Sequence, residues 1–189
     1  MKVNTVVLIL SLFALIGCAQ TMTISESLLG NQPASLTIDS QELSTYVSVP
    51  LINHKFVKVE LYAFPTCVEG DTQLDNKKHL LGRARLTPAN HSQSLAIPSG
   101  KKLLVTLLSE ENFAGNVYSC WTRFSFLAEK DESYLLKATP HKSGFSNQKC
   151  SARLLRQENG NQLPVDSVVG IDTEYKGFWS GHQYKYCPT

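Results

Sequence analysis

The sequence predicts an all-β fold: an antiparallel β-sandwich with an immunoglobulin-like arrangement, joined to a flexible N-terminal lipid tether. Three observations predict the sandwich. Apolar residues recur with a period of two, short strand-like segments follow one another at roughly even spacing, and no helix-length stretch has a clear helical period. The clearest alternation lies in residues 56–64 (FVKVELYAF), where Val57, Val59, Leu61 and Ala63 would face one side and Lys58, Glu60 and Tyr62 the other.

Further strand-like segments cover most of the remaining chain: residues 35–38, 46–49, 80–86, 94–97, 103–108, 118–127, 133–138, 149–155 and 164–169. Turn-forming residues separate several of them, at Asp75-Asn76, Pro98-Ser99-Gly100, Glu129-Lys130-Asp131 and Asn159-Gly160-Asn161. Short strands punctuated in this way are typical of two antiparallel sheets packed face to face.

The first residues have the pattern of an export signal. Lys2 supplies a positive charge, and residues 6–16 (VVLILSLFALI) are all apolar or small. As a helix this run would be only about 16 Å long, which is roughly half of a bilayer core. We therefore expect a signal peptide over residues 1–17, a tether over 18–32 and one sandwich domain over 33–189. The alternative for the tether is a strand or short helix near residues 25–29.

The end of this signal resembles the lipobox of bacterial lipoproteins, here Leu15-Ile16-Gly17-Cys18. The resemblance implies that Cys18 receives a diacylglycerol, that the chain is cut before it, and that its new amino group is acylated. Ala19 replaces the Asp that commonly retains such proteins in the inner membrane, so the expected location is the outer membrane, facing the periplasm. The alternative is an ordinary secretory signal in which Cys18 is a plain thiol.

Four further cysteines, Cys67, Cys120, Cys150 and Cys187, are an even number in a chain expected to reach an oxidising compartment. They predict two disulfides. The favoured pairing is Cys67 with Cys120 and Cys150 with Cys187, and the other connectivities stay open. No C-x-x-C or paired-histidine spacing accompanies them, so the sequence predicts no metal site.

One stretch resembles small, mostly uncharacterised outer-membrane lipoproteins of Gram-negative bacteria. Its elements are Ile97-Pro98-Ser99-Gly100, the strand-like residues 103–108, Cys120, Phe124-Ser125-Phe126, Tyr134-Leu135-Leu136 and Cys150. The resemblance implies a fold and a compartment, and it brings no assigned activity.

Charge and motifs exclude several classes of function. The formal net charge is +2 and no dense run of Lys or Arg is present, so we expect no nucleic-acid partner. The chain contains no G-x-S-x-G, H-E-x-x-H or phosphate-loop motif, and we predict neither an enzyme nor a cofactor. An acidic loop with Glu69, Asp71 and Asp75 lacks the calcium-loop spacing and is interpreted as a solvated connection.

The carboxyl end, residues 175–186 (YKGFWSGHQYKY), is unusually aromatic. Rings among small polar residues suit a contact with an envelope protein or a glycan, and the candidate binding residues are Tyr175, Phe178, Trp179, Ser180, Tyr184 and Tyr186. The alternative is that these rings cover one end of the sandwich. Within this segment, Ser180-Gly181-His182-Gln183-Tyr184 is similar to the S-G-x-x-Y motif of periplasmic lysozyme inhibitors.

The function that the sequence predicts is a binding or assembly module of the envelope, attached to the membrane through its N-terminal lipid. Two alternatives stay open: an inhibitor of a lysozyme-like enzyme, and an enzyme without a local sequence signature.

Overall fold

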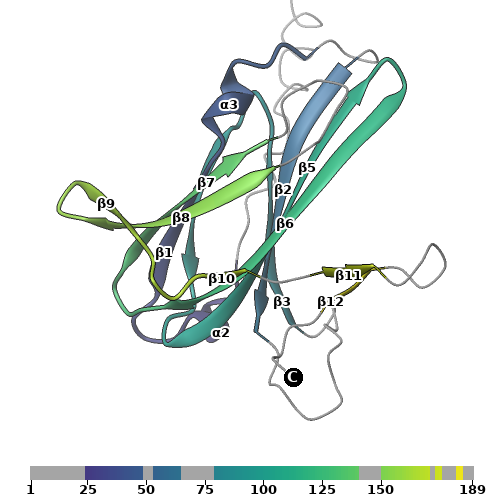
Figure 1. Cartoon of the computed structure of the whole chain (residues 1–189). Helices are drawn as coiled ribbons and strands as arrows, with labels where there is room; N and C mark the ends of the chain where they lie inside the picture. The colour runs from purple at the N-terminus through teal and green to yellow at the C-terminus, as the bar shows by residue number, and fades with distance from the viewer. Residues whose placement is uncertain are drawn as a thin grey trace, which may run out of the picture.

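The computed structural model describes residues 24–48, 53–64, 79–140, 150–170, 173–175 and 182–184. Two five-stranded sheets make up most of it (Figure 1). The first sheet has the order β4 (Ser92–Ile97), β1 (Ala34–Asp39), β7 (Ser133–Thr139), β8 (Ser151–Glu158) and β9 (Asn161–Pro164). The second has the order β10 (Val169–Gly170), β6 (Asn116–Ala128), β5 (Lys101–Phe113), β2 (Asn53–Ala63) and β3 (Leu80–Leu86). A small third sheet pairs β11 (Thr173–Tyr175) with β12 (His182–Tyr184).

The predicted β class is confirmed, and the arrangement of the two sheets is consistent with a β-sandwich. The prediction of an entirely antiparallel fold needs correction. The second sheet is antiparallel, but β1 pairs with β7 in parallel, so the first sheet is mixed. A parallel pair needs a long crossover between its strands, and here all of β2 to β6 lies between β1 and β7 in the sequence.

The core lies between the two large sheets, on the side of each strand that carries its alternating apolar residues. In β2, Val57, Val59 and Leu61 are fully buried, as the two-residue period predicts. They belong to one cluster with Leu36 and Ile38 of β1. The rings of Phe126 in β6 and Tyr134 in β7 meet edge to face, with centroids 5.3 Å apart, which joins the second sheet to the first.

Two predicted strands differ from the structure. Residues 46–48, expected to begin a strand, are not in one, and helix α3 (Gln41–Ser44) precedes them with Leu43 buried. The segment 164–169 is split between the end of β9 and the start of β10, because the chain turns between Val165 and Val168. The Ser167 hydroxyl accepts a hydrogen bond from the Leu127 amide at 3.2 Å, which fixes this turn against β6.

The hairpin of β5 and β6 is much longer than predicted, since both strands continue to a two-residue turn at Ala114 and Gly115. Both residues have positive φ angles, 49° and 81°, as a type I′ hairpin turn requires. The sequence did not predict this extension, because the polar residues from Ser109 to Asn112 have the composition of a loop.

The chain enters the two-sheet domain at its lower end in Figure 1, where helix α2 (Glu26–Leu29) precedes β1. This is the short helix that the sequence left open as an alternative to a tether. Ile24 and Leu29, on either side of its first turn, pack against the core. Neither α2 nor α3, the helices of the described chain, is long and apolar enough to cross a membrane.

Candidate functional site

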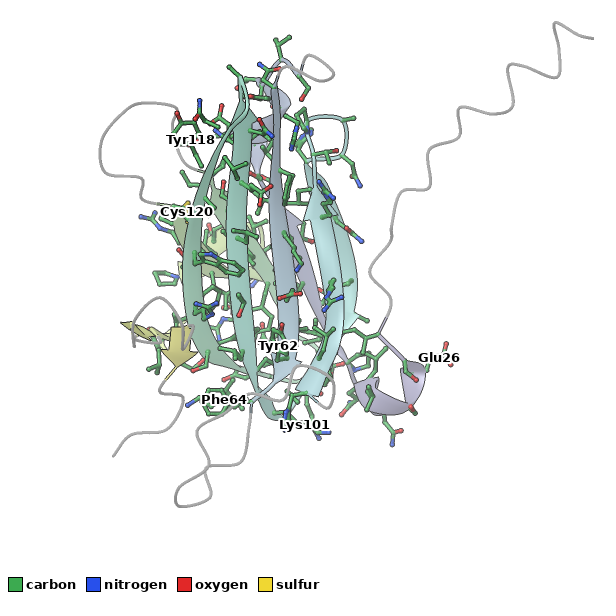
Figure 2. The ribbon with its side chains drawn as sticks, turned by 90° about the vertical axis from the view of Figure 1, so that its right-hand side faces the viewer. Glu26, Tyr62, Phe64, Lys101, Tyr118 and Cys120 are labelled. Carbon is green, nitrogen blue, oxygen red and sulfur yellow. A yellow bond between two sulfur atoms is a disulfide. The ribbon has the colours of Figure 1, made fainter. Side chains whose placement is uncertain are left out.

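The side of the second sheet that faces away from the core is the richest surface in charged and aromatic groups among the described residues. We call it the outward face, and Figure 2 looks onto it. It is formed by the side chains that alternate with the core residues of β2, β3, β5 and β6. The strand registers place Arg83, Glu60, Thr106 and Arg123 in one row across these four strands.

Three cation–aromatic contacts lie on the outward face. The cationic group lies 3.9 Å from the ring centroid in Arg85–Phe56, 4.3 Å in Lys102–Phe64 and 4.9 Å in Arg123–Trp121. Each contact holds a long, flexible cation against a ring, so part of its conformational entropy is lost before any partner arrives. These three cations are therefore held in position on the face.

The buried carboxylate of Glu60 contacts several side chains of the outward face. Its carboxylate accepts hydrogen bonds from Arg83 Nε at 2.7 Å and from the Tyr62 hydroxyl at 2.8 Å, and Lys58 Nζ lies 2.8 Å away. Burial alone would raise the pKa of the Glu60 carboxyl, but the hydrogen bonds from Lys58 and Tyr62 and the charges of Lys58 and Arg83 lower it below its usual value. Glu60 is thus an ionised group that holds two cations in place.

Glu60 and Tyr62 lie on the side of β2 opposite its core residues, as the alternation predicted. Both are buried, with only 8% and 3% of their surface exposed. A carboxylate tolerates this burial because it is paired and hydrogen-bonded. The sequence carries no signal for this network, since Arg83 lies on another strand.

The outward face is positively charged. Among the described side chains, five cations, Lys58, Arg83, Arg85, Lys102 and Arg123, share it with two carboxylates, Glu60 and Glu110, which is a net charge of +3 for these seven groups. Trp121 is 47% exposed at the same place. Exposed aromatic and Arg side chains are the residue types that dominate binding energies at interfaces.

A second polar cluster lies on the inward side of the same sheet, toward the hairpin end of β5. Lys55 Nζ lies 3.5 Å from the Glu111 carboxylate, and the two side chains are only 8% and 4% exposed. The ammonium group is also 5.4 Å from the centre of the Tyr46 ring. Burial, followed by the charge of Glu111, raises the pKa of Tyr46 to about 12. We interpret this cluster as part of the structure, since both charged side chains are almost fully buried.

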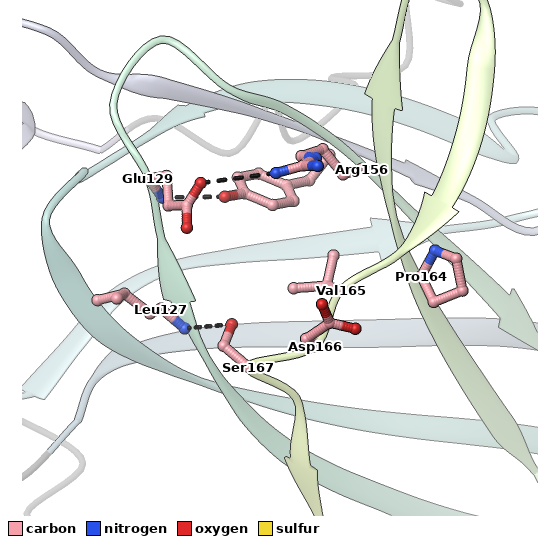
Figure 3. Close-up of a pocket in the computed structure, with 8 residues that line it drawn as sticks. Leu127, Glu129, Arg156, Pro164, Val165, Asp166 and Ser167 are labelled. Carbon is pink, nitrogen blue, oxygen red and sulfur yellow. Dashed lines mark hydrogen bonds and ion pairs between the residues drawn. The ribbon is translucent and has the colours of Figure 1, made fainter.

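A pocket of about 180 Å³ lies where the β6–β7 turn meets the connection from β9 to β10 (Figure 3). Its lining residues are Leu127, Glu129, Tyr134, Arg156, Pro164, Val165, Asp166 and Ser167. The Tyr134 hydroxyl accepts a hydrogen bond from the Glu129 amide at 2.9 Å, and Arg156 lies 3.8 Å from the Glu129 carboxylate. The pocket is smaller than most ligand sites, and its only cation, Arg156, already lies beside Glu129, so it is a weaker candidate than the outward face.

Cys120 and Cys150 form a disulfide, with Cα atoms 5.8 Å apart. This corrects the favoured pairing of Cys67 with Cys120 and of Cys150 with Cys187. Cys120 lies in β6 and Cys150 directly precedes β8, so the bridge joins the two large sheets. The pairing could not be derived from the sequence because it depends on which strands face each other. Cys67 and Cys187 lie outside the described residues.

Replacing Cys120 and Cys150 together by serine should lower the free energy of unfolding by roughly 3.5 kcal/mol, the chain-entropy value for a loop of about this length. The two residues are 30 positions apart. Urea unfolding of the oxidised protein and the variant measures the difference.

With this bridge formed and Cys18 acylated, Cys67 and Cys187 are expected to pair with each other in non-reducing peptide maps. A Cys67–Cys120 peptide would contradict both expectations.

The structure reaches only part of the binding surface predicted at the carboxyl end. Tyr175 and Tyr184 lie in the antiparallel pair β11–β12, whose backbones Figures 1 and 2 show on the outward side of the second sheet, near β6. Phe178, Trp179, Ser180 and Tyr186 lie outside the described residues, as do Cys18 and the acidic loop at residues 69–75. In the part of the chain that is described, no group of three or more His, Cys, Asp and Glu side chains could hold a metal ion.

Comparisons with known proteins add no assignment. No known protein family, curated protein or solved structure matches this chain.

Proposed function

We propose that this chain is a lipid-anchored protein of the bacterial envelope that acts by binding, through the outward face of the second sheet. The observation that carries the proposal is the set of three cation–aromatic contacts on one positively charged face. These groups are held in position, are partly exposed, and occupy a broad sheet surface. Such a surface suits recognition of a partner, whereas a catalytic centre needs reactive groups gathered in a water-poor recess.

The location rests on the amino terminus and on the cysteines. The signal-like residues 1–17 and the lipobox-like residues 15–18 support export and acylation at Cys18, with the outer membrane as destination and the periplasm as the compartment faced. The Cys120–Cys150 disulfide is what an oxidising compartment favours. An anchored binding module would meet envelope proteins and glycans there.

The immunoglobulin-like arrangement stays a prediction within this proposal. Antibody constant domains place their first, second, fifth and fourth strands in one sheet, and their third, sixth and seventh in the other. Here β1 lies between β4 and β7, so such an arrangement would be a variant of that order. An experimental structure compared strand by strand with that order would decide it.

Site-specific photocrosslinking in intact cells tests the proposed face. Ser119 in β6 is exposed and lies opposite Glu110, so a photoreactive residue there would sample the outward face without removing a cation. Lys137 in β7, exposed on the first sheet, is the matched control position. We expect adducts from position 119 and few from position 137. Equal yields from both positions would contradict binding through the outward face.

The anchor is tested by changing Cys18 to serine. Lipid transfer needs the cysteine sulfur, and signal peptidase II acts only after lipid transfer, so the variant should accumulate as uncut precursor. Wild-type protein should fractionate with outer membranes, because two or more acyl chains give stable attachment. Immunoblots of membrane fractions measure both. Mature, freely diffusing protein from the variant would indicate an ordinary secretory signal and remove the lipid anchor from the proposal.

A further inference from the structure

We propose that two copies of this chain associate through the open edge of β6, residues 117–121, and join their second sheets into one continuous sheet. This inference goes beyond the proposed function, because it concerns a second copy of the chain and not the partner that the outward face binds. It depends on the backbone groups along the open edge, on the side chains beside them, and on the position of β10.

The open edge presents backbone groups that no described strand pairs. β6 lies at a margin of the second sheet (Figure 2), where β10 pairs with it only at Phe124 and Ser125 among the described residues. The two-residue turn directs the N–H and C=O groups of even-numbered β6 residues toward β5, so those of odd-numbered residues point away from the sheet. The Leu127 amide, which donates to the Ser167 hydroxyl, has this orientation. Another strand could therefore pair with residues 117, 119 and 121.

The side chains of this segment lack the features that usually prevent strands from pairing. Residues 116–122 (NVYSCWT) contain no charge and no proline, and Val117 and Trp121 are 60% and 47% exposed. Other margins of the two large sheets differ: β3 carries two arginines, β9 ends at Pro164, and β4 exposes no large apolar side chain. Exposed apolar groups on an uncharged edge are typical of a strand-pairing surface.

The position of β10 selects the register in which a second copy pairs. A twofold axis at Ser119 starts the β6 strand of the other copy opposite Thr122, which is short of β10. An axis at Cys120 would instead place Asn116 of the other copy opposite Phe124, where β10 already pairs. An axis nearer the turn would pair fewer residues. The axis at Ser119 is therefore the one that we infer.

Side chains of matching character meet in this register. Val117 of each copy lies opposite Trp121 of the other, and the two copies of Ser119 lie opposite each other between these pairs. Aromatic side chains beside β-branched ones, and hydroxyls beside hydroxyls, are favourable cross-strand pairs. The two apolar groups that one copy leaves exposed would thus cover each other in the pair, as a self-complementary twofold contact requires.

The association has a consequence for binding. A twofold axis between antiparallel strands is perpendicular to the sheet, so the outward faces of the two copies would point to the same side. A partner with two binding sites could then contact both faces at once, and the second contact would form at a high effective concentration.

The test measures the mass of the full processed chain in detergent by sedimentation equilibrium. S119K and S119E each place two like charges opposite each other at the axis, and each should raise the dimer dissociation constant by about fivefold or more. A mixture of S119K and S119E places opposite charges there and should restore dimers to within about threefold of wild type. The matched control is S92K, at an exposed serine of β4 on the other sheet, which should stay within about twofold of wild type.

A second arm tests the backbone hydrogen bonds. S119P removes an N–H group that points away from β5, whereas S119A keeps it. Two hydrogen bonds are lost by symmetry, so S119P should weaken the dimer by about tenfold and S119A by less than about twofold. The thermal midpoint of every variant is measured first, to compare only folded proteins.

Three outcomes would overturn the inference: a monomeric wild type, equal masses of wild type and S119K, or a mixture of S119K and S119E that stays monomeric. Association driven by the acyl chains alone would give equal masses, because all variants share the anchor. Photocrosslinking at position 119 separates this inference from the proposed function. An adduct with twice the mass of the chain indicates a second copy. If the adducts contain only other molecules, the dimer is wrong and the proposed binding face stands.

Discussion

Replacing Glu111 by alanine is expected to lower the free energy of unfolding by about 3 to 5 kcal/mol, the range found when one partner of a buried ion pair is removed. The side chain is 4% exposed and lies 3.5 Å from Lys55 Nζ. Its loss removes the carboxylate that neutralises a buried ammonium group. Urea unfolding at neutral pH, followed by circular dichroism, measures the change.

Two controls separate the charge from the volume of the side chain. The double variant K55M/E111L removes both charges and keeps much of the volume, so it should be close to neutral or stabilising compared with E111A. Glu110 is less buried and lies on the outward face, and E110A should change stability by less than about 0.5 kcal/mol. Similar effects of E110A and E111A would show that the Lys55–Glu111 pair is not buried.

Replacing Phe126 by alanine should also cost about 3 to 5 kcal/mol. The ring is fully buried and meets the ring of Tyr134 across the two sheets. Its removal leaves a cavity where the second sheet contacts the first, and rigid β-sheets can collapse into such a space only in part. Thermal and urea unfolding of the oxidised protein measure the loss.

The next residue in the chain supplies the matched control. Leu127 is 44% exposed because successive side chains of a strand point to opposite faces. L127A should therefore change stability by less than about 1 kcal/mol. If the costs of the two substitutions were reversed, β6 would be shifted by one residue in its register and the outward face would be assigned to the wrong side chains.

Much of the fold follows from local pattern. The alternation in residues 56–64 correctly predicted which side chains of β2 face the core, and the segments at 80–86 and 133–138 matched β3 and β7 closely. The sequence also predicted the turns at Gly100 and Gly160. Both residues adopt positive φ angles, which Gly accommodates at no cost, so Gly is a reliable signal at such positions. These features depend on neighbouring residues alone.

The features that the sequence could not predict depend on which strands meet. Ser109 to Asn112 have a loop-like composition, and only the pairing of β5 with β2 places Glu111 beside Lys55 in the interior. The parallel contact of β1 with β7 and the Cys120–Cys150 bridge likewise follow from how the sheets assemble. Patterns with a period of two do not distinguish among these pairings.

The candidate site was missed for the same reason. Its cations come from β2, β3, β5 and β6, segments that are separated in the sequence by up to about sixty residues, so no basic run is visible. The sequence instead pointed to the aromatic segment near Trp179 as the binding surface, since its five rings lie within twelve residues, 175–186. Rings at positions 56, 64 and 121 each looked like isolated strand residues until the registers placed a cation beside them.

The measurement that tests the central claim most directly is capture of partners from crosslinked envelopes by three otherwise identical proteins: wild type, R85A/R123A and K137A/R153A. The two variants lose the same formal charge from opposite sheets, and all of the substituted residues are at least partly exposed. Binding through the outward face predicts that capture falls strongly for R85A/R123A and stays near the wild-type amount for K137A/R153A. Equal capture by both variants, with melting temperatures unchanged, would contradict it.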